Sequence, residues 1–492
     1  MKVLLLIAAA MLCLAIGQPA LATGNDLPDI GSAADSMIST DEEYQIGRMV
    51  VRGLESAGRV LTDPLVENYI EDVGHKMVAY AHDGDHRFNF FVVKDNTINA
   101  FALPGGFIGV NAGLILQTEN ESELAGVMAH EVAHVTQRHV VRRAQADQRS
   151  SMLSTAALIA GLLIAATTGA SPDMTTAIVM ASQGYNAQQQ INHTRANEYE
   201  ADRVGIGFLA AAGFDPTSMA DFFGTMSRMS GKSGSAMPEY LRTHPMESSR
   251  IAEASDRAAQ YPTVHKVDSD GYLLMRERLR VLGADSPDEI LRYYEQYTRD
   301  RPGPHALHIR YGYALAMLGR HQLPDALGTF RILLNERPDI IAFHLGYAET
   351  LEASGQIADA LSAYQNAQAL FPRNVPVSVA YSRALIAAGD PGQAHRILLD
   401  LLNNIPPTSE QARLIATAAS AEGDMANAHY YMSEYHVING ELAMAADQLN
   451  LALDVPGLEP VQRARFQARL EEISEYIPEY TKRQTAAAPQ KR

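Results

Sequence analysis

The chain has 492 residues, of which 47% are hydrophobic and 20% are charged. This composition is typical of globular proteins and excludes disordered, collagen-like and multispanning membrane proteins, and the length predicts two or three domains. The 57 acidic residues outnumber the 40 basic ones, giving a formal charge of −17 that argues against nucleic acid as a partner.

Residues 1–22 have the pattern of a secretory signal peptide. Lys2 is followed by an apolar run to Ile16 and by small residues that predict cleavage after Ala22. The run is shorter than the roughly 20 residues that a membrane anchor needs. Cys13, the one cysteine, lies in this segment and fits a lipoprotein cleavage site poorly. Without it, a thiol nucleophile, a disulfide framework and a cysteine-bound metal are excluded.

The next part of the chain alternates helical and strand-like patterns. Helical spacing of apolar residues begins at residue 41, with Asp63-Pro64 as a cap followed by a first-turn proline. A Pro-Gly-Gly break separates the second and third predicted strands. The predicted elements are helical segments within 41–81, a strand at 88–93, two strands within 99–110, and helices at about 121–144 and 195–212. We expect one α/β domain, mainly α, over residues 24–265.

The pattern His-Glu-x-x-His occurs within the helix predicted at 121–144. His130 and His134 are four residues apart and share a helix face, so both imidazoles can reach one metal ion while Glu131 lies beside it. Zinc is the expected ion. A third ligand, a carboxylate, would then leave the fourth position open for catalysis.

The third ligand has to come from another part of the chain. A metzincin site would need glycine at 137 and histidine at 140, but the chain has Gln137 and Val140 there. His139 is out of register for that role. The metzincin class is therefore excluded.

A downstream helix offers carboxylates. Glu198 and Asp202 are four residues apart, so one can bind the metal while the other holds an imidazole N–H. Glu200 is nearly opposite on the helix and is expected to be solvated. The alternative is that Glu198 and Asp202 lie on a surface helix with no metal.

The second half of the chain is rich in alanine and repeats every 34 residues, the length of the tetratricopeptide repeat. Small alanines permit close helix packing, glycines mark turns, prolines end units and tyrosines fill the space between helices. The recurring residues are Pro304, Pro338, Pro372 and Pro406; Tyr313, Tyr347 and Tyr381; Ala326, Ala360, Ala394 and Ala428; and Gly355, Gly389 and Gly423. We expect an all-α repeat solenoid over residues 270–475 and a disordered tail at 481–492.

In order and spacing, the Pro-Gly-Gly segment, His-Glu-x-x-His and Glu198-x-x-x-Asp202 resemble the M48 family of zinc metallopeptidases. This resemblance implies a zincin-like first domain with one zinc ion bound by His130, His134 and Glu198. It also implies that Glu131 is the general base. With Glu198 as the metal ligand, Asp202 is left as the carboxylate that holds an imidazole N–H.

The resemblance further implies an edge strand that pairs with extended substrate through backbone hydrogen bonds. That strand would contain Gly106, Phe107, Ile108, Gly109 and Val110.

The signal peptide and repeats resemble the periplasmic, repeat-bearing branch of the family, whose members are proteases and chaperones of outer-membrane protein assembly. This implies a periplasmic location, peripheral at the outer membrane. Clients would be unfolded or misassembled outer-membrane proteins, and the repeats would bind the assembly machinery. The alternative is a non-proteolytic repeat adaptor or chaperone with a structural metal site. A free glutamate beside three ligands favours the enzyme, because structural zinc sites usually have four protein ligands.

Residues 150–172 carry no charge and are numerous enough to span a membrane. A single crossing would separate Glu198 from His130 and His134 and prevent the zinc site from forming. A return span over residues 174–190 would bury asparagine and glutamines in lipid at high cost. We therefore expect no transmembrane span in the mature chain. Residues 150–190 are expected to form an apolar loop or hairpin beside the site, as a lid or a contact for a membrane-protein partner.

His244 lies in a Thr-His-Pro segment and is followed by Arg250. One possibility is a surface-loop histidine before a domain junction. The other, which the family resemblance favours, is a loop that folds back over the zinc site. His244 would then be a regulatory zinc ligand in the fourth position, and Arg250 would anchor the loop or stabilise the oxyanion.

Overall fold

The computed structural model describes residues 39–81, 87–146, 195–230, 238–262, 264, 267–402 and 407–477. The predicted signal peptide, the apolar segment 150–190 and the predicted tail lie outside these residues. None of the helices in the described ranges is long and apolar enough to cross a membrane.

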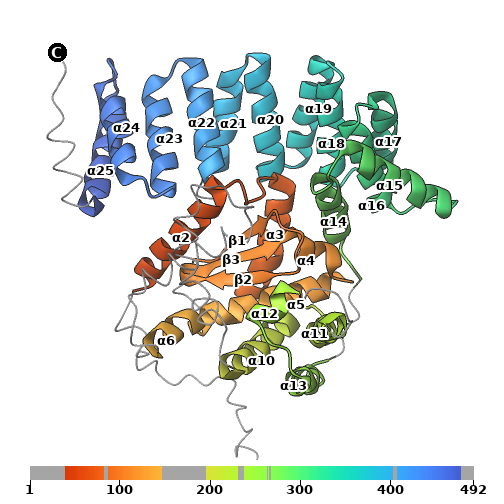
Figure 1. Cartoon of the computed structure of the whole chain (residues 1–492). Helices are drawn as coiled ribbons and strands as arrows, with labels where there is room; N and C mark the ends of the chain where they lie inside the picture. Colours follow the sequence, from red (N-terminus) through yellow and green to blue (C-terminus); the bar gives the residue numbers. More distant parts are fainter. Residues whose placement is uncertain are drawn as a thin grey trace, which may run out of the picture. The chain divides into compact units, whose positions relative to one another are not determined.

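A three-stranded sheet forms the middle of the first half of the chain (Figure 1). Its strands are β1 (Asn89–Val93), β2 (Ala100–Leu103) and β3 (Phe107–Asn111). Their order is β1-β3-β2, with β3 parallel to β1 and antiparallel to β2. The short 3₁₀ turn η3 (Pro104–Gly106) joins β2 to β3. This confirms the predicted strands and the Pro-Gly-Gly break.

The prediction of an edge strand at β3 is wrong. Gly106 ends the η3 turn, and Phe107, Ile108, Gly109 and Val110 lie in β3, which has β1 on one side and β2 on the other. The reason is that β1, buried from Phe90 to Val93, pairs in parallel with β3 across the chain. Among the described residues, β2 is therefore the strand that leaves an edge open beside the metal-binding helix.

Nine helices of the first half are described around this sheet. They are α2 (Thr40–Ser56), α3 (Pro64–Val78), α4 (Ala112–Gln117), α5 (Glu121–Thr136), α6 (His139–Ala146), α10 (Arg195–Ala211), α11 (Thr217–Ser230), α12 (Glu239–Thr243) and α13 (Ser248–Ala258). Asp63 caps α3 as predicted, because its side chain accepts a hydrogen bond from the Val66 N–H. The single helix expected at 121–144 is two helices, since Arg138 has a φ of 49° and turns the chain between α5 and α6.

The second half is a series of antiparallel helices packed side by side (Figure 1). They are α14 (Asp270–Leu282), α15 (Pro287–Asp300), α16 (Leu307–Gly319), α17 (Leu323–Glu336), α18 (Ile341–Ala353), α19 (Ile357–Leu370), α20 (Val375–Ala388), α21 (Pro391–Leu402), α22 (Ser409–Glu422), α23 (Met425–Ile438), α24 (Leu442–Asp454) and α25 (Pro460–Tyr476). The repeat glycines Gly355, Gly389 and Gly423 all have positive φ, which confirms their predicted place in turns. The repeat alanines Ala326, Ala360, Ala394 and Ala428 are buried, as close helix packing requires.

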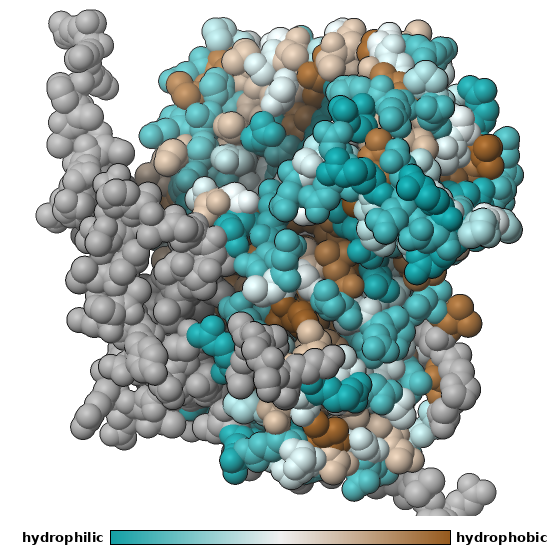
Figure 2. Space-filling model, turned by 45° about the vertical axis from the view of Figure 1, so that its right-hand side comes forward, coloured by the Kyte–Doolittle hydropathy of each residue, from teal (hydrophilic) through white to brown (hydrophobic). Residues whose placement is uncertain are grey.

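One hydrophobic core cluster contains residues from both halves, including Phe90 and Val92 of β1 and Tyr311 and Phe343 of the solenoid. The domain boundary between residues 265 and 270 therefore stays a prediction. On the face shown in Figure 2, hydrophilic residues predominate and hydrophobic ones form scattered patches.

Candidate metal centre

Helix α5 presents two imidazoles to the same point. The Nε2 atoms of His130 and His134 are 2.9 Å apart, and both side chains are buried. The opposing helix α10 comes close because Gly205 lies against α5. A Cβ atom on Gly205 would be 3.0 Å from the Ala129 carbonyl oxygen. This close packing brings the acidic residues of α10 to the two histidines.

The two carboxylates of α10 take different places around His130. Glu198 reaches the Nε2 side, with its oxygens 3.6 Å from His130 Nε2 and 3.6 Å from His134 Nε2. Asp202 lies behind the ring, 2.8 Å from His130 Nδ1. Both carboxylates are buried, which contradicts the surface-helix alternative. The geometry therefore separates one carboxylate that can bind a metal from one that can orient a ligand.

His244 follows α12 and lies over the same point. Its Nδ1 is 3.1 Å from Glu198 Oε2 and 3.4 Å from His130 Nε2, and its ring stacks on Tyr240. The side chain is buried, so the surface-loop alternative is wrong. The ligand atoms of the four residues His130, His134, Glu198 and His244 all lie within 4.8 Å of one another. Whether His244 binds zinc stays a prediction.

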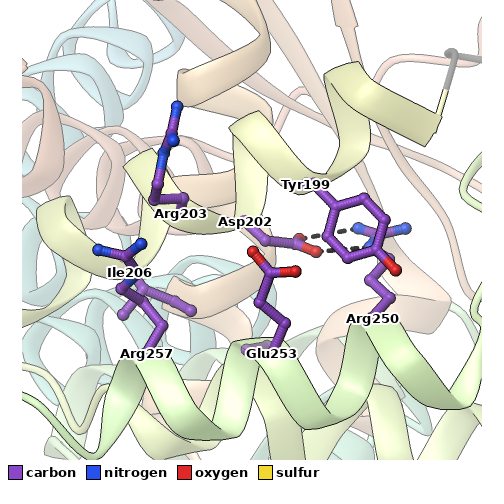
Figure 3. A pocket seen from close by; sticks show the side chains of 8 residues that line it. Tyr199, Asp202, Arg203, Ile206, Arg250, Glu253 and Arg257 are labelled. Atoms are coloured by element: carbon purple, nitrogen blue, oxygen red, sulfur yellow. Dashed lines mark hydrogen bonds and ion pairs between the residues drawn. The ribbon is translucent and has the colours of Figure 1, made fainter.

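Arg250 of α13 pairs with Asp202 (Figure 3) and also reaches Glu198. Its Nη2 donates to Asp202 Oδ1 at 2.8 Å, its Nε donates to Oδ2 at 2.5 Å, and its Nη1 is 2.7 Å from Glu198 Oε2. Burial acts to raise the pKa of Asp202, but the hydrogen bonds and charge of Arg250 hold it below its usual value. For Glu198, burial is likewise outweighed by His244, His130 and Arg250, which lower the pKa well below its usual value. Both acids are therefore ionised.

Glu131 is fully buried beside the cluster. Its Oε1 is 3.5 Å from His244 Nε2, and neither carboxylate oxygen makes a hydrogen bond of normal geometry to any described group. Burial raises its pKa, while His244 and His130 oppose the increase. A buried carboxylate with open acceptor positions fits a partner that is not part of the chain. Next to Glu131, the imidazole nitrogens of His130 and His134 and a carboxylate oxygen of Glu198 form a donor set that suits zinc.

The edge strand β2 lies next to α5. The backbone N–H of Ala102 in β2 is near enough to Glu131 to lower the pKa of its carboxyl. The open edge of the sheet therefore lies at the predicted general base.

Two further residues at the centre were not expected from the sequence. His139 at the start of α6 is buried, and its Nδ1 is 2.8 Å from Nδ1 of His134. Its Nε2 is 3.1 Å from Glu200 Oε2, and Glu200 also accepts a hydrogen bond from Arg142 at 3.0 Å. Glu200, which was expected to be solvated, is partly exposed but also pairs with His139 and Arg142. The signal for these contacts was a histidine five positions after His134, but only the turn at Arg138 reveals that it points back.

Comparisons with known proteins agree with this geometry. The model of peptidase family M48 matches residues 64–258, and a tetratricopeptide repeat model matches residues 351–418. The beta-barrel assembly-enhancing protease of Escherichia coli (strain K12) is 32% identical over 97% of this chain and 98% of its own. A Vibrio cholerae protein is 40% identical over 67% of this chain and 68% of its own. A mitochondrial metalloendopeptidase OMA1 of Schizosaccharomyces pombe is 28% identical over 38% of this chain and 52% of its own.

The recognition of the family from three short segments is confirmed, and with it the zinc dependence and the endopeptidase activity. The chain belongs to peptidase family M48, among its zinc metalloendopeptidases that carry tetratricopeptide repeats.

Proposed function

We propose that this zinc metalloendopeptidase acts in the periplasm, where it degrades misassembled outer-membrane proteins and assists the assembly of others as a chaperone. Its signal-peptide pattern supports the location. The relatives named as beta-barrel assembly-enhancing proteases support the client class. The observation that carries the chemistry is the buried cluster of four ligand groups beside Glu131, whose two carboxylate oxygens have no hydrogen bond of normal geometry among the described residues.

His130 and His134 through Nε2, together with a Glu198 oxygen, would hold the zinc ion. When bound, zinc supplies Lewis acidity to a peptide carbonyl and to a water molecule. The Asp202 carboxylate lies 2.8 Å from Nδ1 of His130, where its charge favours a proton on that nitrogen and so the tautomer whose Nε2 is free to coordinate.

Glu131 is the general base in this proposal. Its carboxylate accepts the proton of the attacking water and returns it to the departing amine. The open acceptor positions of the two buried oxygens support this role, because a carboxylate already hydrogen-bonded within the protein would be a poorer acceptor.

Extended substrate would pair with β2 rather than with the buried β3. An unfolded chain can add to the open edge through backbone hydrogen bonds that are largely independent of sequence. The closeness of Ala102 to Glu131 supports this placement, since a peptide along β2 would pass the general base. The solenoid would recruit the client and the outer-membrane assembly machinery.

His244 would restrain the enzyme by taking the fourth zinc position. The contacts of its Nδ1 with Glu198 and His130 support a ligand role in a resting state. Arg250 supports the loop by donating from Nη1 to the Pro245 carbonyl at 3.2 Å, which favours the loop-anchor role over the oxyanion role.

A second candidate is the adaptor with a structural metal. Four protein donors around one point favour it, because closed four-ligand zinc sites are typically structural. The two functions differ in what happens to a bound client.

The test uses the protein without residues 1–22 and three substrates: a denatured outer-membrane β-barrel, the same barrel folded in detergent, and a denatured soluble protein. We expect the denatured barrel to be cleaved faster than the other two, and cleavage to disappear in Glu131→Gln. Binding of the denatured barrel without cleavage would support the adaptor. Equal cleavage of both denatured proteins would contradict the proposed client class.

A further inference from the structure

We propose that His139 and Glu200 are positioning residues for the zinc ligand His134, forming a hydrogen-bonded relay that fixes its ring. The inference deepens the zinc site and rests on the ligand set proposed above.

The relay is visible in consecutive contacts. The Nδ1 atoms of His134 and His139 are 2.8 Å apart, which is hydrogen-bond distance between two buried rings. On the other side of its ring, His139 Nε2 is 3.1 Å from Glu200 Oε2. Arg142 Nη1 donates to the same Glu200 oxygen at 3.0 Å. The chain of contacts therefore runs from the metal side of α5 through α6 to α10.

Hydrogen-bond chemistry assigns a direction to this chain. If His134 coordinates through Nε2, its proton is on Nδ1, and that N–H donates to Nδ1 of His139. His139 then carries its own proton on Nε2 and donates it to the Glu200 carboxylate. Every donor and acceptor in the relay is matched with a neutral His139, so no extra proton is needed.

The two zinc imidazoles are thus supported in parallel ways. On the side of the ring away from the metal position, His130 contacts Asp202, and Asp202 forms an ion pair with Arg250. His134 is held by an imidazole, a carboxylate and Arg142 in sequence. Support of this kind orients a ligand and raises its basicity, and its loss typically lowers metal affinity about 10- to 100-fold.

The turn between α5 and α6 explains how His139 reaches its place. Arg138 has a φ of 49°, rare for a side-chain-bearing residue, and its guanidinium pairs with the buried Glu43 of α2. This pairing holds the turn that directs His139 back under His134.

The experiment measures zinc affinity by chelator competition and the absorption bands of the Co²⁺-substituted protein. All variants carry Glu131→Gln, so that self-cleavage does not interfere. In His139→Leu neither hydrogen bond can form, whereas in His139→Gln the side-chain oxygen can accept from His134 and the amide can donate to Glu200. We expect about 10- to 100-fold weaker zinc binding and shifted Co²⁺ bands for His139→Leu, with near-parent values for His139→Gln.

Glu200→Ala changes a partly exposed residue and tests the relay without removing a buried ring. It should weaken zinc binding in the parent protein but have no further effect in His139→Leu, because the relay is already broken there. Additive effects of the two substitutions on zinc affinity would overturn the relay.

The matched control is His395→Leu, which removes a buried imidazole that contacts Glu422 at 3.0 Å in the solenoid. It should leave zinc affinity and the Co²⁺ bands unchanged. Unchanged zinc affinity in His139→Leu, or equal losses in His139→Leu and His139→Gln, would overturn the proposal. His134→Ala distinguishes failure of the relay from failure of the proposed ligand set. If it also keeps full zinc affinity, the ligand set is wrong, whereas if it alone loses zinc, only the relay fails.

Discussion

The imidazole of His244 is placed between the proposed general base and the proposed zinc ligands, with Nε2 3.5 Å from Glu131 and Nδ1 3.1 Å from Glu198. If it closes the fourth zinc position, removing it should open the site to water. We expect His244→Ala to keep one zinc ion per chain and to cleave a denatured client, or itself, faster than wild type. Zinc analysis and cleavage rates check this. Unchanged or slower cleavage with zinc intact would exclude the restraining role.

Arg250 balances the negative charge of two buried carboxylates. Its removal should therefore lower the free energy of unfolding of the metal-free protein. Removing one partner of a buried ion pair typically costs about 3–5 kcal/mol. We expect Arg250→Met to lower the free energy of unfolding of the zinc-free protein by about this amount, and added zinc to restore part of it by pairing with Glu198. Urea unfolding with and without zinc measures the effect. Arg310→Met, at an exposed pair with Glu336, should lose much less, and equal losses would contradict the account.

Some residues of the proposed site could be assigned a role from the sequence and others could not. His130, Glu131 and His134 were identified because helix periodicity alone places them together. The choice between Glu198 and Asp202 needed the family resemblance, since both lie on one face of α10. His139 and Glu200 could not be assigned roles, because their contacts depend on a turn at Arg138 and on the packing of α6 against α10.

At the scale of elements, the Pro-Gly-Gly turn is fixed by helix α2. Gly105 has a φ of 76°, and a Cβ atom there would be 2.3 Å from the Cα of Tyr44. Gly58 also has positive φ, at 69°, but its Cβ would meet nothing within 4 Å. An alanine at Gly58 would therefore suffer backbone strain alone, whereas an alanine at Gly105 would also clash with α2.

We expect Gly58→Ala to lower stability by about 1–2 kcal/mol, the cost of a left-handed alanine. Gly105→Ala should lower it by clearly more and also slow client cleavage, because α2 must move and the adjacent β2 with it. Thermal unfolding in excess zinc and cleavage assays measure both effects. Similar losses in the two variants would show that α2 does not constrain the turn.

The strands and their break were predictable from local patterns, but the strand order was not. The Pro-Gly-Gly break between two strand-like segments predicts where β2 ends and where β3 begins. Which strand lies at the edge depends on the distant partner β1, which pairs in parallel with β3. Local sequence contains no information on that pairing, so the edge position that the family resemblance implied for residues 106–110 could not be checked from the sequence.

At the scale of the whole molecule, helix α3 of the first half packs against the solenoid helix α20. Glu67 of α3 is half-buried in this region, and burial together with Asp63 and Glu71 raises its pKa to about 7. Arg383 of α20 opposes the shift and Glu410 of α22 adds to it. The folded protein therefore binds a proton at Glu67 that the unfolded chain releases above its ordinary pKa of 4.5.

Because the folded protein holds this proton more tightly than the unfolded chain, raising the pH favours the unfolded chain. Stability should fall as the pH rises from 4.5 towards 7, and the loss should be complete above pH 7. We expect Glu67→Gln to raise the free energy of unfolding at pH 8 by on the order of 2 kcal/mol and to have little effect near pH 4.5. Urea unfolding across this range, with Glu471→Gln on exposed α25 as control, provides the check. A gain at pH 4.5 as large as at pH 8 would contradict the assignment to ionisation.

The repeat period predicted the solenoid well, because 34-residue spacing of small and turn-forming residues is read directly from the chain. The boundary between the halves was less accessible, since the core formed by Phe90, Val92, Tyr311 and Phe343 is continuous across it. This core contains residues more than 200 positions apart in the chain, and such long-range packing produces no periodic pattern in the sequence.

We propose that the buried cluster is a catalytic zinc site in which Glu131 moves the proton. The most direct measurement compares cleavage of a denatured client by His244→Ala and by His244→Ala/Glu131→Gln, with zinc content determined on the same samples. We expect one zinc ion per chain in both proteins, and cleavage at least about 100-fold slower without the carboxylate of Glu131. Equal cleavage by the two proteins would contradict it.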